Sequence, residues 1–159
     1  MKKNIYVDFS YLLMLAATFG ATIVLGAFVA PLIFHTDKIL HSAILDNYNA
    51  GVIMAEIFRR FSYWVYFSAF FVLFYELMMY KKGQRDAILF GSSVTFIFSA
   101  FMFSAVYVPK IISMHILGSE AVLSDTFKNI HVASELDFKI MALALLVLFI
   151  RRLMLLRVS

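Results

Sequence analysis

Four side chains near the C-terminus have the spacing of a binding site on one face of a helix. His131, Ser134 and Glu135 are three and four positions apart, so they share a helical face. Lys139 follows Glu135 by four positions, in the order that favours an acid–base pair. This pattern predicts a polar pocket in which His131 acts as a ligand or proton carrier. The alternative interpretation is a helix entrance whose charges neutralise one another or reach water.

A second charged group precedes another apolar run of the sequence. Glu56 and Arg60 are four positions apart, as expected for a charged, amphipathic first turn. They would lie on the same side of a membrane as His131. A charge buried within a membrane needs a counter-ion, so Glu56 and Arg60 are also candidate partners of the His131 pocket. The sequence leaves both interpretations open.

The histidines are candidate metal ligands. All four histidines lie near ends of apolar runs that would be on one side of a membrane. His35 and His41 follow the first run, His115 follows the third, and His131 lies at the start of the last. Two histidines could bind a haem iron axially, and histidine with methionine suits copper, so haem and copper are the candidate cofactors. No pair has the three- or four-residue spacing of a helical metal site, so a site would have to be assembled from separate segments. Scattered interfacial histidines are the alternative.

The composition indicates a membrane protein and excludes several other classes. Hydrophobic residues make up 63% of the 159 residues, whereas soluble domains contain roughly 45–50%. The net charge of +4 comes from short basic clusters between apolar runs, which indicates membrane topology and no nucleic-acid partner. The absence of cysteine excludes disulfides and thiolate metal sites. No phosphate-binding loop or HExxH motif supports soluble-enzyme chemistry.

Four apolar segments, at about 9–34, 55–80, 87–109 and 130–152, predict membrane-spanning helices. The first is much longer than the core of a signal peptide. The uninterrupted apolar part of the last, Ile140–Ile150, is too short for a hydrocarbon layer of about 30 Å. Its helix must therefore include the polar residues from His131 onwards, which have to face other helices or a wet cavity. We expect an all-α fold, a single domain over 1–159 that forms a four-helix transmembrane bundle in contact with the lipid bilayer.

The basic residues predict the direction of the spans. Lys2 and Lys3 precede the first span, and further basic residues fill the short link after the second span and follow the fourth. Because lysine and arginine accumulate on the cytoplasmic side, both termini should be cytoplasmic in a multi-pass protein of the cell inner membrane. The histidines then lie on the outer side.

A weak internal repeat relates the first and third spans. Gly26-Ala27 followed by Pro31 matches Ser104-Ala105 followed by Pro109. Two helix hairpins of the same orientation would be related by an axis along the membrane normal. The first and third spans are also rich in small residues, so they are expected to form the tight seam of the bundle, with more of the second span facing lipid.

Three stretches carry a family resemblance. They are GAFVAPLIF at Gly26–Phe34, AGVIMAEIFRR at Ala50–Arg60 and FKNIHVAS at Phe127–Ser134. They resemble the family of small bacterial four-helix membrane proteins of unknown function related to transmembrane protein 205. The resemblance implies a His-x-x-Ser motif at His131 and Ser134.

A looser similarity runs to copper-resistance membrane proteins of the D type and to small haem-dependent membrane oxidases. The similarity lies in a helix that ends with an outward histidine. The chain differs from the oxidases because FSYLLML, from Phe9 onwards, contains no early histidine. An enzyme is therefore the less favoured class.

The sequence is compatible with three functions. The leading hypothesis is a protein without enzymatic activity that binds or helps to transport a small ligand or metal ion at the outer polar pocket. The alternatives are a haem-binding membrane redox protein and a structural subunit of a membrane complex. The last would require a homo-oligomeric or other membrane-complex partner.

Overall fold

The computed structural model describes residues 5–40 and 44–158, and within these ranges the chain is helical and contains no strand. Two segments, η1 and η2, are π-helical turns that continue the helices on either side. The elements are α1 (Ile5–Ile23), η1 (Val24–Val29), α2 (Ala30–Phe34), α3 (Thr36–Leu40), α4 (Asn47–Lys81), α5 (Ala87–Phe101), η2 (Met102–Tyr107), α6 (Val108–Ile116), α7 (Ser119–Val122) and α8 (Asp125–Val158). The expectation of an all-α protein is confirmed.

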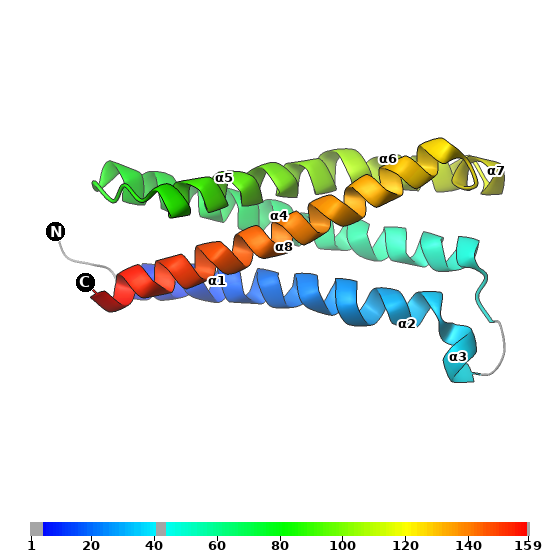
Figure 1. The fold of residues 1–159 in the computed structure, drawn as a ribbon, viewed down its shortest axis with the longest axis horizontal. Coiled ribbons are helices and arrows are strands. Elements are labelled where there is room, and N and C mark those ends of the chain that lie inside the picture. The colour runs from blue at the N-terminus through cyan, green and yellow to red at the C-terminus, as the bar shows by residue number, and fades with distance from the viewer. Residues whose placement is uncertain (1–4, 41–43, 159) are drawn as a thin grey trace.

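The long helices lie side by side with short connections at their ends (Figure 1). α8 crosses the bundle diagonally and packs most extensively against α5 and then α1, while α4 packs on α5, α6 and α1. The first and last described residues and the α4–α5 turn lie at one end of the bundle, here called the terminal end. The short helices α3 and α7 lie at the opposite end (Figure 1).

Three helices are long and apolar enough to cross a membrane, namely Ile5–Phe34, Asn47–Lys81 and Ala87–Ile116. This supports a membrane protein. α8 is outside this set, because charged residues before Ile140 and after Ile150 leave only a short uninterrupted apolar stretch. A fourth span and the cytoplasmic position of the termini therefore stay predictions.

The predicted seam between the first and third spans is wrong. α8 lies against both α1 and α5, and neither helix packs extensively on the other. Of the small residues in α1, Ala16 and Ala17 are exposed, and a Cβ placed on Gly20 would meet nothing within 4 Å. The small residues of α5, such as Ser99 and Ala100, are buried. The close neighbour of both spans is thus α8, and the spans do not pack closely on each other.

The two segments of the internal repeat have the same local structure. Pro31 and Pro109 each occupy the first turn of an α-helix that directly follows a π-helical turn, η1 or η2. Proline has no N–H, and its ring clashes with the carbonyl four residues earlier, so the preceding helix widens to accommodate it. The sequence match thus corresponds to a shared backbone feature, while the pseudo-two-fold axis stays a prediction.

Candidate functional site

The two π-helical turns converge on one residue of α8. A Cβ placed on Gly26 in η1 would lie 3.2 Å from the ring of Phe138. The ring of Phe103 in η2 lies 5.1 Å from that of Phe138, measured between centroids, and Phe58 of α4 lies 5.4 Å away. Segments from three other parts of the chain therefore enclose α8 at the level of Phe138.

Asp137, the neighbour of Phe138, is a buried acid at this level. Its side chain is 9% exposed, and the hydroxyl of Ser99 in α5 lies against its carboxyl group. Neither Asp137 Oδ2 nor the buried Ser104 Oγ of η2 has a hydrogen-bond partner among the described residues. An ionised carboxylate buried in this way is strongly disfavoured unless a cation or a proton accompanies it.

Asp137 also lies far from the terminal end of the bundle. Along α8 it is roughly 21 Å from Arg151, at 1.5 Å per residue. Arg151 Nη2 donates to Asp86 Oδ2 across 2.6 Å in the α4–α5 turn. A hydrocarbon layer is about 30 Å thick. If the terminal end lies at one membrane surface, Asp137 is therefore well inside the membrane.

The predicted residues of α8 divide between two faces of the helix. Ser134 is buried beside Asp137, and its hydroxyl donates to the His131 carbonyl across 2.7 Å. The side chains of Glu135 and Lys139 are exposed and form an ion pair of 2.6 Å with each other. His131 is exposed as well. Of the predicted group, Ser134 alone lies on the inner face.

The predicted partners on α4 are also paired within their own helix. Glu56 accepts from Arg59 Nε across 2.6 Å and from Arg60 Nε across 2.8 Å, and all three side chains are partly or largely exposed. In the part of the chain that the structure describes, no hydrogen bond or ion pair joins Glu56 or Arg60 to His131 or Glu135. Their participation in one pocket stays a prediction.

The histidines occupy different environments. His35 is exposed, and its Nδ1 donates to a carbonyl of its own helix across 2.9 Å. His41 lies outside the described residues. The rings of His115 and His131 both contact Phe127, at centroid distances of 5.4 and 5.9 Å. Within the part of the chain that the structure describes, no three potential ligands from histidine, aspartate and glutamate come together as a metal site.

His115 links α6 to α4 through close packing. It is 7% exposed, and its Nδ1 donates to the Ile111 carbonyl across 2.9 Å. Tyr48 of α4 donates to the His115 backbone carbonyl across 2.7 Å. The other ring nitrogen, Nε2, has no partner in the described chain and faces Gly51 so closely that a Cβ there would lie at 2.7 Å. A metal on Nε2 would need the ring to turn.

An ionic cluster that the sequence did not predict lies at the terminal end. Arg152 is 1% exposed, and its guanidinium donates to Glu76 Oε2 across 2.5 Å and to Gln84 Oε1 across 2.8 Å. Tyr11 donates to the other oxygen of Glu76 across 2.6 Å. Glu76 precedes Lys81 by five residues and Lys82 by six, and it pairs with neither of them. The structure instead turns it into the bundle, where α8 supplies the cation.

Two stacked tyrosines cover the Arg152 guanidinium. The ring centroids of Tyr11 and Tyr75 are 3.7 Å apart, and the guanidinium carbon lies 5.0 Å from the centroid of Tyr75. Tyr75 donates to the buried Asp8 across 2.6 Å. Asp8, Glu76 and Arg152 thereby connect α1, α4 and α8. This cluster, here called the Arg152 cluster, fixes the helices relative to one another.

Comparison with known proteins gives one relationship. Residues 13–120 match the model of a protein family described as a domain of unknown function, DUF4149, which is more than half of the 159 residues. The chain belongs to the DUF4149 family. No curated protein and no solved structure matches it. The DUF4149 match includes both proline segments and ends before α8, which supplies Asp137 and Arg152. The resemblances to the transmembrane protein 205 and copper-resistance families stay predictions.

The turn between α4 and α5 of this DUF4149 protein offers a test of its electrostatics. Asp86 is the N-cap of α5, accepting from the Leu89 N–H across 2.9 Å, and also pairs with Arg151. The hydrogen bond from Arg151 holds the pKa of Asp86 below its ordinary value of 3.8. The ion pair therefore stabilises the fold above that pH, and the contribution is lost as the pH falls through the lowered pKa.

We expect Asp86→Asn to lower the free energy of unfolding at neutral pH and to lose this effect in acid, since asparagine keeps the cap but not the charge. Asp86→Ala also removes the cap and should cost about 1 kcal/mol more. Denaturant titrations of the purified protein in detergent micelles, from neutral pH to below pH ~3, measure both. Equal stability of the two variants would contradict the capping role.

Proposed function

We propose that this DUF4149 protein is a multi-pass protein of the cell inner membrane that binds a small cation, the proton included, at Asp137. In this proposal α8 is a fourth span and both termini are cytoplasmic. Three apolar helices of sufficient length support the membrane location. The basic residues around the terminal end, among them Lys81, Lys82 and Arg85, support the orientation because cytoplasmic ends are rich in lysine and arginine.

The observation that carries the proposal is the unpartnered oxygen of Asp137. Ionisable groups inside a membrane bundle that have no ion-pair partner often mark ion or proton sites, since burying them in the membrane is costly. Asp137 adjoins Phe138, and Phe138 contacts both π-helical turns. Interrupted helices at matching positions of two halves of a membrane protein are a general indication of a binding site.

The chemistry of the surroundings favours a proton or a hard cation. Asp137 and the neighbouring hydroxyl of Ser99 offer oxygen atoms, which suit hard cations better than copper. The outer residues give less support to a metal site, because Glu56 and Glu135 are each neutralised on their own helix. The proposal keeps the hypothesis of a small bound ligand, but its binding site is on the inner face of α8 and not at the exposed residues.

A stability measurement with Asp137→Asn tests this proposal. A ligand that binds only the folded state raises the free energy of unfolding by about 2.7 kcal/mol at 100 times its dissociation constant. We expect thermal unfolding of the wild type in detergent to move upward with acid or with one of the ions Li⁺, Na⁺ and K⁺. Asp137→Asn, which mimics the neutral acid, should not show this upward shift.

Glu135→Gln is the matched control, because Glu135 is an exposed acid on the same helix. This variant should respond to pH and cations as the wild type does. The proposal would be wrong if the wild type were insensitive to both, or if Asp137→Asn kept the full response.

A further inference from the structure

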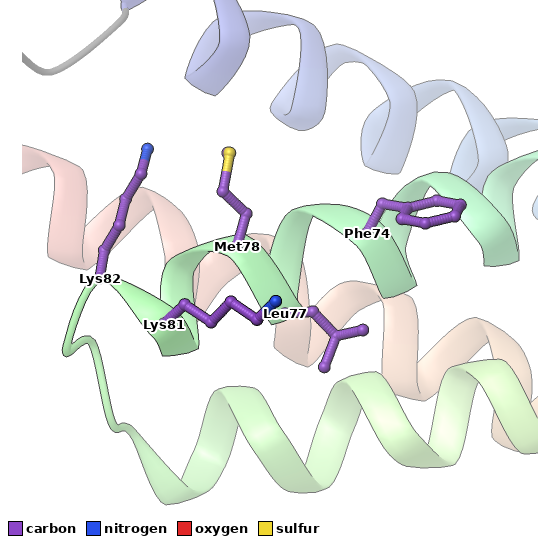
Figure 2. Close-up of a pocket in the computed structure, with 5 residues that line it drawn as sticks. All are labelled: Phe74, Leu77, Met78, Lys81 and Lys82. Atoms are coloured by element: carbon purple, nitrogen blue, oxygen red, sulfur yellow. The ribbon is translucent and has the colours of Figure 1, made fainter.

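One face of α4 at the terminal end forms an open, largely apolar groove. Its lining residues recur at the three- and four-residue spacing of a single helical face (Figure 2). The side chains of Phe74 and Leu77 are about half exposed or more, so no other element covers them. The lining residues are Phe74, Leu77, Met78, Lys81 and Lys82. This set is called the Lys81 groove below.

The two lysines of the Lys81 groove are not neutralised from within the described chain. Neither the Lys81 nor the Lys82 side chain has a hydrogen bond or ion pair there. The acids nearest in the sequence, Glu76 and Asp86, are paired with the two arginines of α8. Two positive charges are thus left at one end of an apolar strip that faces outward.

We propose that the Lys81 groove binds an anionic phospholipid of the membrane leaflet at the terminal end. The lipid phosphate binds the amino groups of Lys81 and Lys82, whose flexible side chains point apart in Figure 2 and turn toward it, and an acyl chain runs along Met78, Leu77 and Phe74. From Lys82 to Phe74 the helix spans roughly 12 Å, which places the apolar strip within the adjoining hydrocarbon. Basic residues at the cytoplasmic ends of spans are general sites for acidic lipids.

The opposite end of the bundle provides an internal comparison. A second open groove there is lined by one lysine, Lys110, together with Pro109, Ile130 and neighbouring residues of η2 and α6. It lacks a second cation to complete a phosphate site, so it is expected to select acidic lipids less. The lipid proposal rests on α4 crossing the membrane and is independent of any cation at Asp137.

Lipid retention by the purified full-length chain tests the proposal. The protein is equilibrated in mixed micelles of phosphatidylglycerol and phosphatidylcholine, and native mass spectrometry counts the lipids that stay bound. We expect the wild type to retain phosphatidylglycerol in preference. Lys81→Gln/Lys82→Gln should reduce this retention about thirtyfold, as expected for losing two lysines near an anionic surface, whereas Lys81→Arg/Lys82→Arg should keep it.

Two controls make the result decisive. Lys38→Gln/Lys128→Gln removes two exposed lysines at the opposite end and should leave phosphatidylglycerol retention unchanged. Excess inorganic phosphate should not displace the lipid, because it offers no acyl chain to the apolar strip. Unchanged retention in Lys81→Gln/Lys82→Gln, an equal loss in the control pair, or complete displacement by phosphate would overturn the proposal.

Discussion

Replacing Arg152 by leucine should lower the free energy of unfolding by about 3–5 kcal/mol, the range found when one partner of a buried ion pair is removed. The guanidinium is almost fully buried and bonds to Glu76 and Gln84. Its loss leaves Glu76 without a cation inside the bundle, while the two stacked tyrosines lose the charge beside them. Denaturant unfolding in detergent micelles, followed by circular dichroism, measures the effect.

Two further variants separate this ion pair from charge in general. Arg60 is 76% exposed in its side chain, so Arg60→Gln should change the free energy of unfolding by no more than about 0.5 kcal/mol. Glu76→Leu/Arg152→Leu removes both partners and should be more stable than Arg152→Leu alone, because no uncompensated charge is left. Arg152→Leu as stable as Arg60→Gln would show that the Arg152 cluster does not hold the helices together.

The helical class and three membrane-length helices follow from sequence because they depend on local properties. Runs of about 20 apolar residues are sufficient to predict a span. The same reasoning fails for helix neighbours. Small residues permit close approach but do not say which helix approaches, and Ala16 and Ala17 face outward while Ser99 faces α8. The position of α8 between α1 and α5 is set by the whole bundle.

Asp137 shows why the candidate site was only partly predictable. The spacing of His131, Ser134 and Glu135 shows that they share one part of the helix surface. Whether that part faces the bundle depends on which side of α8 packs against the neighbouring helices. The second half of α8 is apolar on all sides, from Ile140 to Ile150, so its pattern gives no direction. The structure rotates α8 so that Ser134 and Asp137 face inward and Glu135 faces outward.

Arg152 escaped prediction for a related reason. An arginine that follows an apolar run is normally an interfacial charge that marks topology. Its partner Glu76 is distant in the sequence and belongs to another helix, so their contact depends on tertiary packing. The stacked pair Tyr11 and Tyr75 likewise comes from two helices. Long-range pairs of this kind have no spacing rule in a single sequence.

Gly51→Ala is expected to destabilise the contact between α4 and α6 by about 1–3 kcal/mol, the usual cost of overpacking a filled interior. The new Cβ would lie 2.7 Å from His115 Nε2. The His115 ring cannot move away easily. Its Nδ1 donates to the Ile111 carbonyl, and the ring of Phe127 packs against it in a T-shaped arrangement. Thermal unfolding in detergent measures the loss.

Glycine positions with free space separate this clash from helix propensity. A Cβ on Gly20 or Gly91 meets nothing within 4 Å, so Gly20→Ala and Gly91→Ala should stabilise their helices by about 0.5–1 kcal/mol. In a His115→Ala background the clash is absent, and Gly51→Ala should then become neutral or stabilising. A Gly51→Ala variant as stable as Gly91→Ala would mean that His115 does not pack on α4. The difference between the effect of Gly51→Ala in the wild type and in the His115→Ala background therefore measures how closely His115 of α6 packs on α4.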